Sequence, residues 1–154
     1  YHTRECPGEC NIHMVNPSPL SYIVLFRCRN GYVRTRGSVF KIDEGIYAYV
    51  GSCGNHCGAR IMRHLAGDVR TKYWHVDYLH DLCDELAVMV LPYGESCVAR
   101  ALLSEYEGIP GFGSSDKRED RTHLFRIRST SENPMRILLL LRKLIKRKLA
   151  GKDL

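Results

Sequence analysis

Hydrophobic and polar positions along the chain predict a mixture of short strands and amphipathic helices. Runs of β-branched and aromatic residues are typical of strands, whereas apolar residues spaced three and four apart are typical of helices. The predicted strands span residues 22–28, 32–40, 46–50, 86–91 and 123–128. The predicted helices span residues 59–66, 73–82, 95–106 and a last segment that begins at Asn133 and Pro134. This order predicts an α/β fold in which helices flank a small, mainly antiparallel central sheet.

Turn signals separate the first strands from one another. Asn30 and Gly31 form a strong hairpin signal directly after the first strand, and residues 41–45 turn the chain again. The first 50 residues are therefore expected to form a small antiparallel sheet. Residues 1–19 combine turn residues without a helical or strand period, which indicates an irregular lead-in.

The last predicted helix carries most of the net charge. From Arg126 to Leu154 the chain holds nine Lys and Arg residues against two Asp and Glu, whereas the first 125 residues hold 14 against 15. A near-neutral body with a basic end indicates a polyanionic partner, and a solvated helix face is the equally weighted alternative. We therefore divide the chain into a lead-in at 1–19, a domain at 20–128 and a basic amphipathic helix at 129–154.

The same helix has an apolar stripe that needs a cover. Its members recur at helical spacing and are Ile137, Leu138, Leu141, Leu144, Ile145 and Leu149. The stripe must dock on the body of the protein or on a partner, which would be another copy of the chain or a larger assembly.

Composition narrows the class of protein further. The 154 residues are 44% hydrophobic and 26% charged, which is typical of one globular domain and excludes a disordered or collagen-like chain. The apolar runs, such as Ile137 to Leu141, are too short to cross a bilayer, and no cleavable apolar leader is expected. A cytoplasmic protein without a membrane partner is therefore expected. The absence of Gln and the excess of Arg over Lys, 16 to 7, hint at a thermophilic source.

Seven cysteines are many for an intracellular chain of this size. The odd number requires at least one free thiol or a bridge to another chain. Two Cys-x₃-Cys pairs and a nearby histidine could bind a structural zinc ion, although their spacing is looser than in usual zinc sites. These candidate ligands are Cys6, Cys10, Cys53 and Cys57, with His13 or His56. Disulfides, for example from Cys6 or Cys10 to a cysteine of the body, are equally allowed, and the sequence does not give their connectivity. Cys28, Cys83 and Cys97 are expected to be unpaired buried thiols.

The segment Tyr49-Val50-Gly51 opens the part of the chain that carries chemistry. It ends a predicted strand, and after a loop a helix presents Arg60 and His64 four residues apart. This arrangement resembles the GIY-YIG nuclease superfamily. In that family a Gly-Ile-Tyr strand lies beside a Tyr-Ile-Gly strand, a helix carries Arg with His or Tyr four residues on, and a glutamate on a later helix binds one divalent metal ion.

Three downstream segments sharpen the resemblance. They are residues 73–79, 110–116 and 123–125. Their order is similar to that in an uncharacterised, mainly prokaryotic branch of the family that is sometimes fused to endonuclease III. The similarity covers about residues 20–128 and implies the family's fold, with the lead-in and the basic helix outside it.

The first tyrosine motif departs from the family pattern. By strand position Ser21 and Tyr22 match the first motif, so that serine replaces its glycine. The literal letters Gly-Ile-Tyr occur instead at 45–47, on the same strand as the second motif. Tyr47 and Tyr49 are two apart and share one sheet face, so Tyr47 remains a substitute candidate. For any one of these tyrosines, a packed strand aromatic is the alternative role.

The resemblance implies hydrolysis of DNA phosphodiester bonds in repair or processing. Tyr22 is then the general base, with its pKa lowered by a nearby arginine and metal ion, and Tyr49 positions the water or shares the proton. Arg60 offers a planar fork to phosphate oxygens, and His64 lies on the same helical face.

The metal ion implied by the resemblance is a single Mg²⁺ or Mn²⁺. Glu95 is its expected ligand, because it opens a predicted helix whose first turn could face the cleft. Glu105 and Glu107 are rival ligands on the same predicted helix and just beyond it.

Weaker candidates complete the expected site. Asp77 could orient His75 or an outer metal water, and Asp116 and His123 flank a loop that could close over the site. The cations expected to contact nucleic acid are Arg63, Lys72, Arg142, Lys143, Lys146 and Arg147. DNA is the expected partner, followed by RNA or a ribonucleoprotein. A non-catalytic binding module that uses the same fold and the basic helix is the alternative function.

Overall fold

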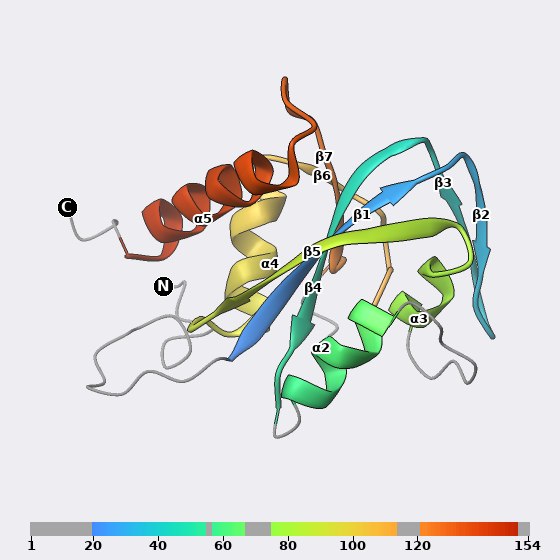
Figure 1. The fold of residues 1–154 in the computed structure, drawn as a ribbon, viewed down its shortest axis with the longest axis horizontal. Coiled ribbons are helices and arrows are strands. Elements are labelled where there is room, and N and C mark those ends of the chain that lie inside the picture. Colours follow the sequence, from blue (N-terminus) through green and yellow to red (C-terminus); the bar gives the residue numbers. More distant parts are fainter. Residues whose placement is uncertain (1–19, 55–56, 67–74, 114–120, 151–154) are drawn as a thin grey trace.

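A five-stranded antiparallel sheet forms the centre of the computed structural model, which describes residues 20–54, 57–66, 75–113 and 121–150 (Figure 1). The strand order is β5-β1-β4-β7-β6. These strands are β1 (Ser21–Cys28), β4 (Gly45–Ser52), β5 (Cys83–Leu91), β6 (Glu107–Gly108) and β7 (Leu124–Ile127). Four helices belong to the described part of the chain: α2 (Cys57–Ala66), α3 (His75–Leu79), α4 (Glu95–Leu103) and α5 (Pro134–Ala150). The expected α/β fold, with helices flanking a mainly antiparallel sheet and a last C-terminal helix, is confirmed.

The pairing expected for the first 50 residues is wrong. The strand predicted over 32–40 is two strands, β2 (Gly31–Arg34) and β3 (Val39–Ile42), which form a separate two-stranded sheet. Residues around Gly37 turn the chain there, and the backbone N–H of Thr35 donates to the carbonyl of Ser38 at 2.9 Å. β1 therefore pairs with β4 and β5 rather than with the strand that follows Asn30.

Asn30 has a different role from that of a hairpin turn. Its side-chain oxygen accepts a hydrogen bond from the backbone N–H of Glu44 at 2.7 Å. This contact closes the base of the β2–β3 hairpin, which is inserted between β1 and β4. The Asn30-Gly31 pair does follow the first strand, but this local signal does not decide which strand pairs with β1. Long-range pairing with β4 and β5 decides it.

Strand β1 divides the protein into two layers, because successive side chains of a strand point to opposite faces. Ile23 and Leu25 face one core cluster, whereas Tyr22, Val24 and Phe26 face the other. All of these side chains are buried, as expected for a strand that has neighbours on both edges.

The first layer is apolar and is covered by α4 and α5, which pack on one face of the sheet (Figure 1). Ile137, Leu141 and Ile145 of α5 are completely buried in it. The stripe of the basic helix therefore docks on the body of the protein. None of the helices in the described ranges is long and apolar enough to cross a membrane.

The second layer is aromatic and lies on the opposite face of the sheet. The inner face of the β2–β3 hairpin contributes Val33, Phe40 and Ile42, while α3 contributes Val76 and Leu79. Figure 1 places the hairpin, α2 and α3 on this side, away from α5. This layer carries the candidate site.

Several element boundaries differ from the prediction. The helix predicted over 73–82 ends at Leu79 in α3, with residues 73 and 74 outside the described part, and the helix predicted over 95–106 ends at Leu103. Glu107 and Gly108, predicted as helix end and loop, form the edge strand β6 beside β7. The start of α5 is confirmed, because the side-chain oxygen of Asn133 accepts the N–H of Met135 at 2.9 Å and Pro134 is the first helical residue.

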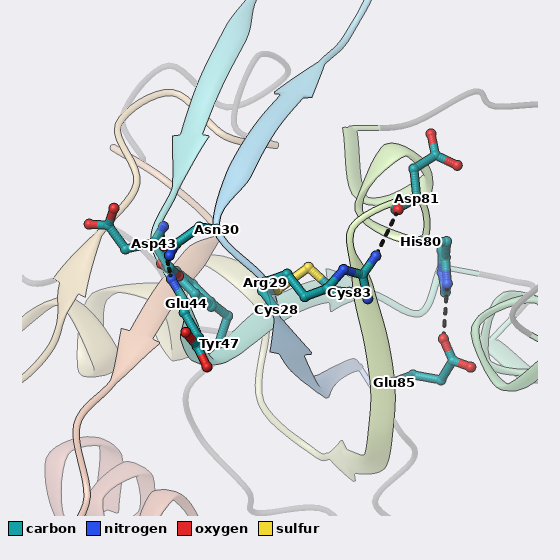
Figure 2. Close-up of a disulfide and its surroundings, with 10 residues drawn as sticks. All are labelled: Cys28, Arg29, Asn30, Asp43, Glu44, Tyr47, His80, Asp81, Cys83 and Glu85. Atoms are coloured by element: carbon teal, nitrogen blue, oxygen red, sulfur yellow. Dashed lines mark hydrogen bonds and ion pairs between the residues drawn. A yellow bond between two sulfur atoms is a disulfide. The ribbon is translucent and has the colours of Figure 1, made fainter.

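The expectation of unpaired thiols at Cys28, Cys83 and Cys97 is also wrong. Cys28 and Cys83 lie opposite each other on β1 and β5 and are joined by a disulfide (Figure 2). Cys97 is likewise disulfide-bonded. Cys53 and Cys57 are joined to each other, so in this structure they are not thiolate ligands for zinc. Cys6, Cys10, His13 and His56 lie outside the described residues, as does the predicted lead-in.

Candidate functional site

A pocket of about 270 Å³ opens in the aromatic layer, where the start of β1 and the end of β4 meet α2 and the first residue of α4. Its lining combines phenols, guanidiniums, imidazoles and carboxylates. The lining residues are Tyr22, Tyr49, Ser52, Arg60, Arg63, His64, Val76, Asp77, Glu95, Gly113 and His123. All five residues predicted as catalytic, from four separate stretches of the sequence, line this one pocket.

Tyr22 reaches the pocket because glycine stands opposite it. Tyr22 on β1 pairs with Gly51 on β4, and its ring lies over the space where a Cβ at position 51 would be. Any larger residue at 51 would collide with this ring. The glycine of the Tyr-Val-Gly segment is therefore required by the close approach of the first tyrosine, which is 4% exposed.

Gly113 lies against the ring of Tyr49, the second tyrosine of the pocket. Gly113 has φ +73°, a conformation that favours glycine, and its Cβ position lies 3.2 Å from the ring of Tyr49. The ring of Phe112 meets Tyr49 edge-on, with centroids 6.5 Å apart. The ring of Tyr49 therefore packs between β4 and the loop that includes Phe112 and Gly113, and Tyr49 is 7% exposed.

The environment that the protein forms around Tyr22 opposes the lowered pKa that was expected for this phenol. Burial, the largest cause, raises the pKa of Tyr22 well above its ordinary value, and the Arg60 guanidinium opposes this rise only in part. Burial likewise raises the pKa of Tyr49 well above 10.0. Both phenols therefore keep their protons at neutral pH.

His64 is the group beside Tyr22 that can take up a proton. Its Nε2 lies 3.1 Å from the Tyr22 hydroxyl in a hydrogen bond whose direction depends on the imidazole tautomer. Burial, assisted by the nearby His80, lowers the pKa of His64 to about 4. The imidazole is therefore neutral at physiological pH and has one unprotonated ring nitrogen.

Arginines of α2 line the pocket on one side. Arg60 Nη1 donates to the carbonyl of Ser52 at 2.6 Å, which ties the guanidinium to the end of β4. Arg63 donates from Nε and Nη2 to the two carboxylate oxygens of Asp77, at 3.2 and 3.1 Å. The Asp77 side chain is 1% exposed, so this two-pronged ion pair fixes α2 against α3.

Glu95 places a carboxylate at the pocket from the opposite side. It is the first residue of α4, and its side chain is 12% exposed. Its Oε2 lies 3.3 Å from Nδ1 of His123, which comes directly before β7. The helix N-terminus favours the ionised carboxylate at this position.

The donor set suits one hard cation. Mg²⁺ commonly binds proteins through one or two carboxylates and completes its coordination with water and phosphate oxygens. Glu95 can supply such a carboxylate. In the described part of the chain, no three His, Cys, Asp or Glu side chains gather into a larger ligand set. The rivals Glu105 and Glu107 are exposed and are not among the pocket residues.

Tyr47 is not a substitute for Tyr22. It shares a face with Tyr49, but its hydroxyl donates to the carbonyl of Asp43 at 2.8 Å and accepts from the Asp43 N–H at 3.2 Å. Figure 2 shows it near the opposite end of β4, beside Asn30 and Glu44. This tyrosine closes the turn before β4 and does not line the pocket.

The remaining predicted residues are divided between the two layers. Asp77 and Arg63 line the pocket. His75 begins α3, and its side chain lies outside the described part of the structure. Lys72 and Asp116 lie outside the described residues. The cations of α5 belong to the helix that covers the opposite face of the sheet. They are Arg142, Lys143, Lys146 and Arg147, all exposed or half-buried.

Sequence reasoning missed the supporting residues of the site. The Ser52 carbonyl and Val76 carry no signal in a sequence, since any residue has a carbonyl and most helices bury a valine. Gly113 could have been found, because the Gly-Phe-Gly segment at 111–113 invites positive φ at both glycines, and both have it. His80 and Glu85, described below, were missed as well.

Comparison with known families identifies the chain as part of a larger group. Residues 21–146 match the family model described as "Domain of unknown function DUF123". The chain belongs to the DUF123 family. The match begins at β1 and includes most of α5, so the basic helix lies within the DUF123 region together with the pocket. No curated protein and no solved structure matches the chain.

Proposed function

We propose that this DUF123 protein is a metal-dependent endonuclease that hydrolyses DNA phosphodiester bonds, in repair or processing. The observation that carries the proposal is the convergence of Tyr22, Tyr49, Arg60, His64 and Glu95 on one pocket. Four distant stretches of sequence supply these five side chains. The pocket also contains two guanidiniums, of Arg60 and Arg63, and two carboxylates, of Asp77 and Glu95, which the packing of a core does not by itself require. The resemblance to GIY-YIG nucleases supports the same conclusion.

The charges of the pocket are suited to a phosphodiester. Arg60 presents donors to phosphate oxygens, and its bond to the Ser52 carbonyl orients the guanidinium before any substrate arrives. The Arg63 charge is largely neutralised by Asp77, so Arg63 supports α2 more than it attracts substrate. Arg60 is therefore the principal phosphate-binding group.

The raised pKa of Tyr22 changes the proton path from that of a phenolate base. The attacking water gives its proton to the Tyr22 oxygen while Tyr22 passes its own proton to Nε2 of neutral His64, 3.1 Å away. The resulting hydroxide oxygen forms a bond to phosphorus, and the bond from phosphorus to the departing oxygen breaks. The departing oxygen takes a proton from solvent, and His64 later returns to solvent the proton that came from the attacking water. Tyr49 orders the water from the neighbouring strand.

Glu95 would hold one Mg²⁺ or Mn²⁺ ion, which when bound neutralises charge on the departing oxygen. The chain's own contribution is to keep the carboxylate ionised at the start of α4 and oriented by His123.

Cleavage assays on branched, nicked and single-stranded DNA, with and without divalent ions, test the proposal. Arg60→Ala and Glu95→Gln should each reduce the rate by about 10²-fold or more, because each removes charge stabilisation at the reacting phosphate. Glu105→Gln is the matched control for Glu95, since this residue is exposed outside the pocket. Cleavage that survives in the double variant Arg60→Ala, Glu95→Gln would contradict the proposal.

The basic helix α5 is proposed to bind backbone phosphates without reading bases. It lies on the layer opposite to the pocket, so it would hold a different stretch of nucleic acid from the one being cut. Reversal of Arg142 and Arg147 to Glu should flatten the salt dependence of DNA affinity. An unchanged slope would assign the helix to packing or to a protein partner.

A non-catalytic module for nucleic acid or ribonucleoprotein is the second candidate. Two observations favour it. Ser21 stands where GIY-YIG nucleases have glycine, and burial raises the pKa of both pocket tyrosines. Such a module would bind DNA or RNA with the salt dependence described above. It would show no divalent-dependent cleavage that Arg60→Ala removes.

A further inference from the structure

His64 is supported from behind by a second histidine. His80 lies in the turn after α3, and its ring stacks on that of His64 with centroids 5.8 Å apart and planes inclined by 23°. The ring of Phe26, on β1, also meets the His80 ring edge-on, with centroids 5.5 Å apart and planes inclined by 77°. The His80 side chain is 3% exposed. A buried imidazole in this position restricts the plane of the His64 ring.

Glu85 in turn holds His80. Its Oε2 lies 3.0 Å from Nδ1 of His80, a contact drawn in Figure 2. The contact has an ion-pair distance but is not a hydrogen bond, because Nδ1 of His80 has no hydrogen-bond partner. The carboxylate acts on this nitrogen through its charge. The contacts thus form a continuous series from Glu85 through His80 to His64 and then to the Tyr22 hydroxyl.

A β-bulge turns Glu85 toward His80. The register of β5 against β1 shifts between Leu25 and Phe26, which leaves Leu86 without an opposite residue. Leu86 packs in the apolar layer and Val88 in the aromatic one, although residues two apart normally share a face. The extra residue is the reason that Glu85 faces the aromatic layer while its neighbour Asp84 faces solvent. Bulges of this kind re-aim side chains next to functional sites.

The segment that carries His80 also holds the adjacent residue of α2. Asp77, three residues before His80, binds Arg63, which is the neighbour of His64 on α2. The Cys28–Cys83 disulfide joins the far end of this segment to β1 (Figure 2). Arg63 and His64, which are consecutive on α2, therefore both contact residues of the segment 77–80. The disulfide at Cys83 connects the end of this segment to β1.

The charges that face His64 come from every element around it. Tyr22 of β1 and Tyr49 of β4 are neutral phenols, with ring centroids 5.4 and 6.3 Å from that of His64. Asp77 of α3 favours the imidazolium, whereas His80 and Arg63, which lies on α2 beside His64, disfavour it. Replacement of His80 should therefore raise the pKa of His64 from about 4 toward its ordinary value.

We propose that His80, held by Glu85, is a positioning residue that keeps His64 in place and unprotonated beside the Tyr22 hydroxyl. The inference rests on the proposed function for the reaction that His64 assists, but the arrangement itself can be tested without any reaction. His80 does not line the pocket, so it acts on substrate only through His64.

Nuclear magnetic resonance of the full chain with ¹⁵N-labelled histidine tests the arrangement directly. In His80→Phe, which keeps a flat ring against His64, the pKa of His64 should rise by about one unit. In Glu85→Gln the proton on Nδ1 of His80 should shift toward Nε2, which the ring ¹⁵N shifts report. Asp84→Asn is the matched control on the solvent face of β5 and should change neither signal.

Cleavage assays on the same variants provide the second readout. His80→Phe should lower kcat about tenfold with KM unchanged, and the acid limb of the pH–rate profile should move to higher pH. The positioning role would be overturned by a His64 titration that is unchanged in His80→Phe together with a His80 tautomer that is unchanged in Glu85→Gln, whether or not the protein cuts DNA. A shifted titration in a protein without cleavage would leave the positioning role intact and remove the proposed nuclease.

Glu85→Gln keeps the proposal testable if His80→Phe fails to fold. It retains the size and shape of the side chain and removes only the charge. An unchanged His80 tautomer in this variant alone is sufficient to overturn the inference.

Discussion

The two faces of the central sheet differ in chemistry although the same strand supplies both. The layer under α4 and α5 is a closed apolar core in which Ile137, Leu141 and Ile145 are completely buried. The layer under α2 and α3 buries tyrosines, histidines and an aspartate among its aromatic residues. Apolar burial stabilises a fold without any requirement for partners, whereas each buried polar group needs one. The first layer therefore secures the sheet, and the second can carry groups that are costly to bury.

This comparison also explains why the pocket needs so many supporting contacts. Asp77 and His64 are 0% and 2% exposed, and each contacts a side chain of another element, Arg63 and Tyr22 respectively. Without these partners the layer would contain uncompensated charge and more unpaired polar atoms, in addition to Nδ1 of His64, which already has no hydrogen-bond partner. Four predictions separate the two layers, from the largest expected effect to the smallest.

Asp77→Ala should destabilise the protein by about 4 kcal/mol, because it leaves the Arg63 guanidinium half-buried without its carboxylate. Chemical denaturation of the wild type and the variant measures the loss. Asp84→Asn, on the exposed side of β5, is the control and should cost little. Equal stability of Asp77→Ala and the wild type would show that the aromatic layer does not depend on this ion pair.

Leu141→Ala should cost about 3 kcal/mol, since it opens a cavity in the apolar layer where Leu141 is completely buried. The pKa of His64 should stay near 4, because this layer does not touch the pocket. Calorimetry gives the stability, and the histidine titration gives the second quantity. A change in the titration would mean that the two layers are coupled through the sheet.

Acid should destabilise the aromatic layer selectively. The pKa of His64 is about 4 in the folded protein and about 6.5 in the unfolded chain, so the unfolded state binds more protons between these values. The stability present above pH 6.5 should fall by roughly 3 kcal/mol as the pH drops to 4. His64→Phe should reduce this slope, as measured by denaturation at several pH values. The same slope in both proteins would assign the acid sensitivity to other groups.

Asn133→Ala should have the smallest effect, about 1 kcal/mol, because it removes one capping hydrogen bond at the start of α5. The helix is anchored by its buried stripe, so the fold should persist and only the midpoint of thermal unfolding should decrease. Asn133→Asp, which keeps the capping oxygen, is the matched control. A loss several times larger would mean that α5 depends on its cap more than on its apolar face.

Local patterns in the sequence were sufficient for most elements of the fold. Alternation and β-branched residues located β1 and β7, and the Asn-Pro start located α5, because these signals depend on neighbouring residues only. The partner of β1 was mispredicted because hairpin signals describe a turn, whereas sheet pairing depends on which distant strands bury the two faces. The boundaries of α3 and α4 were too long for the same reason, since tertiary packing decides where a helix ends.

For the candidate site, the residue types and their separation along the chain were readable, and the resemblance to a known superfamily named Tyr22, Tyr49, Arg60, His64 and Glu95 together. Their environment was not readable. Burial raises the pKa of Tyr22 and lowers that of His64, and desolvation is a property of the folded interior rather than of any residue. The bulge that turns Glu85 toward His80 depends on the register between two strands about 60 residues apart.

The sequence by itself determined the kinds of groups that are available to the candidate site, because side-chain chemistry and helical spacing are local. Only the tertiary structure decided that these groups meet in one pocket, that the basic helix lies on the opposite layer, and that a neutral imidazole accompanies the first tyrosine. The physical reason is that proximity, burial and electric field arise between segments that are distant in the chain and adjacent in space.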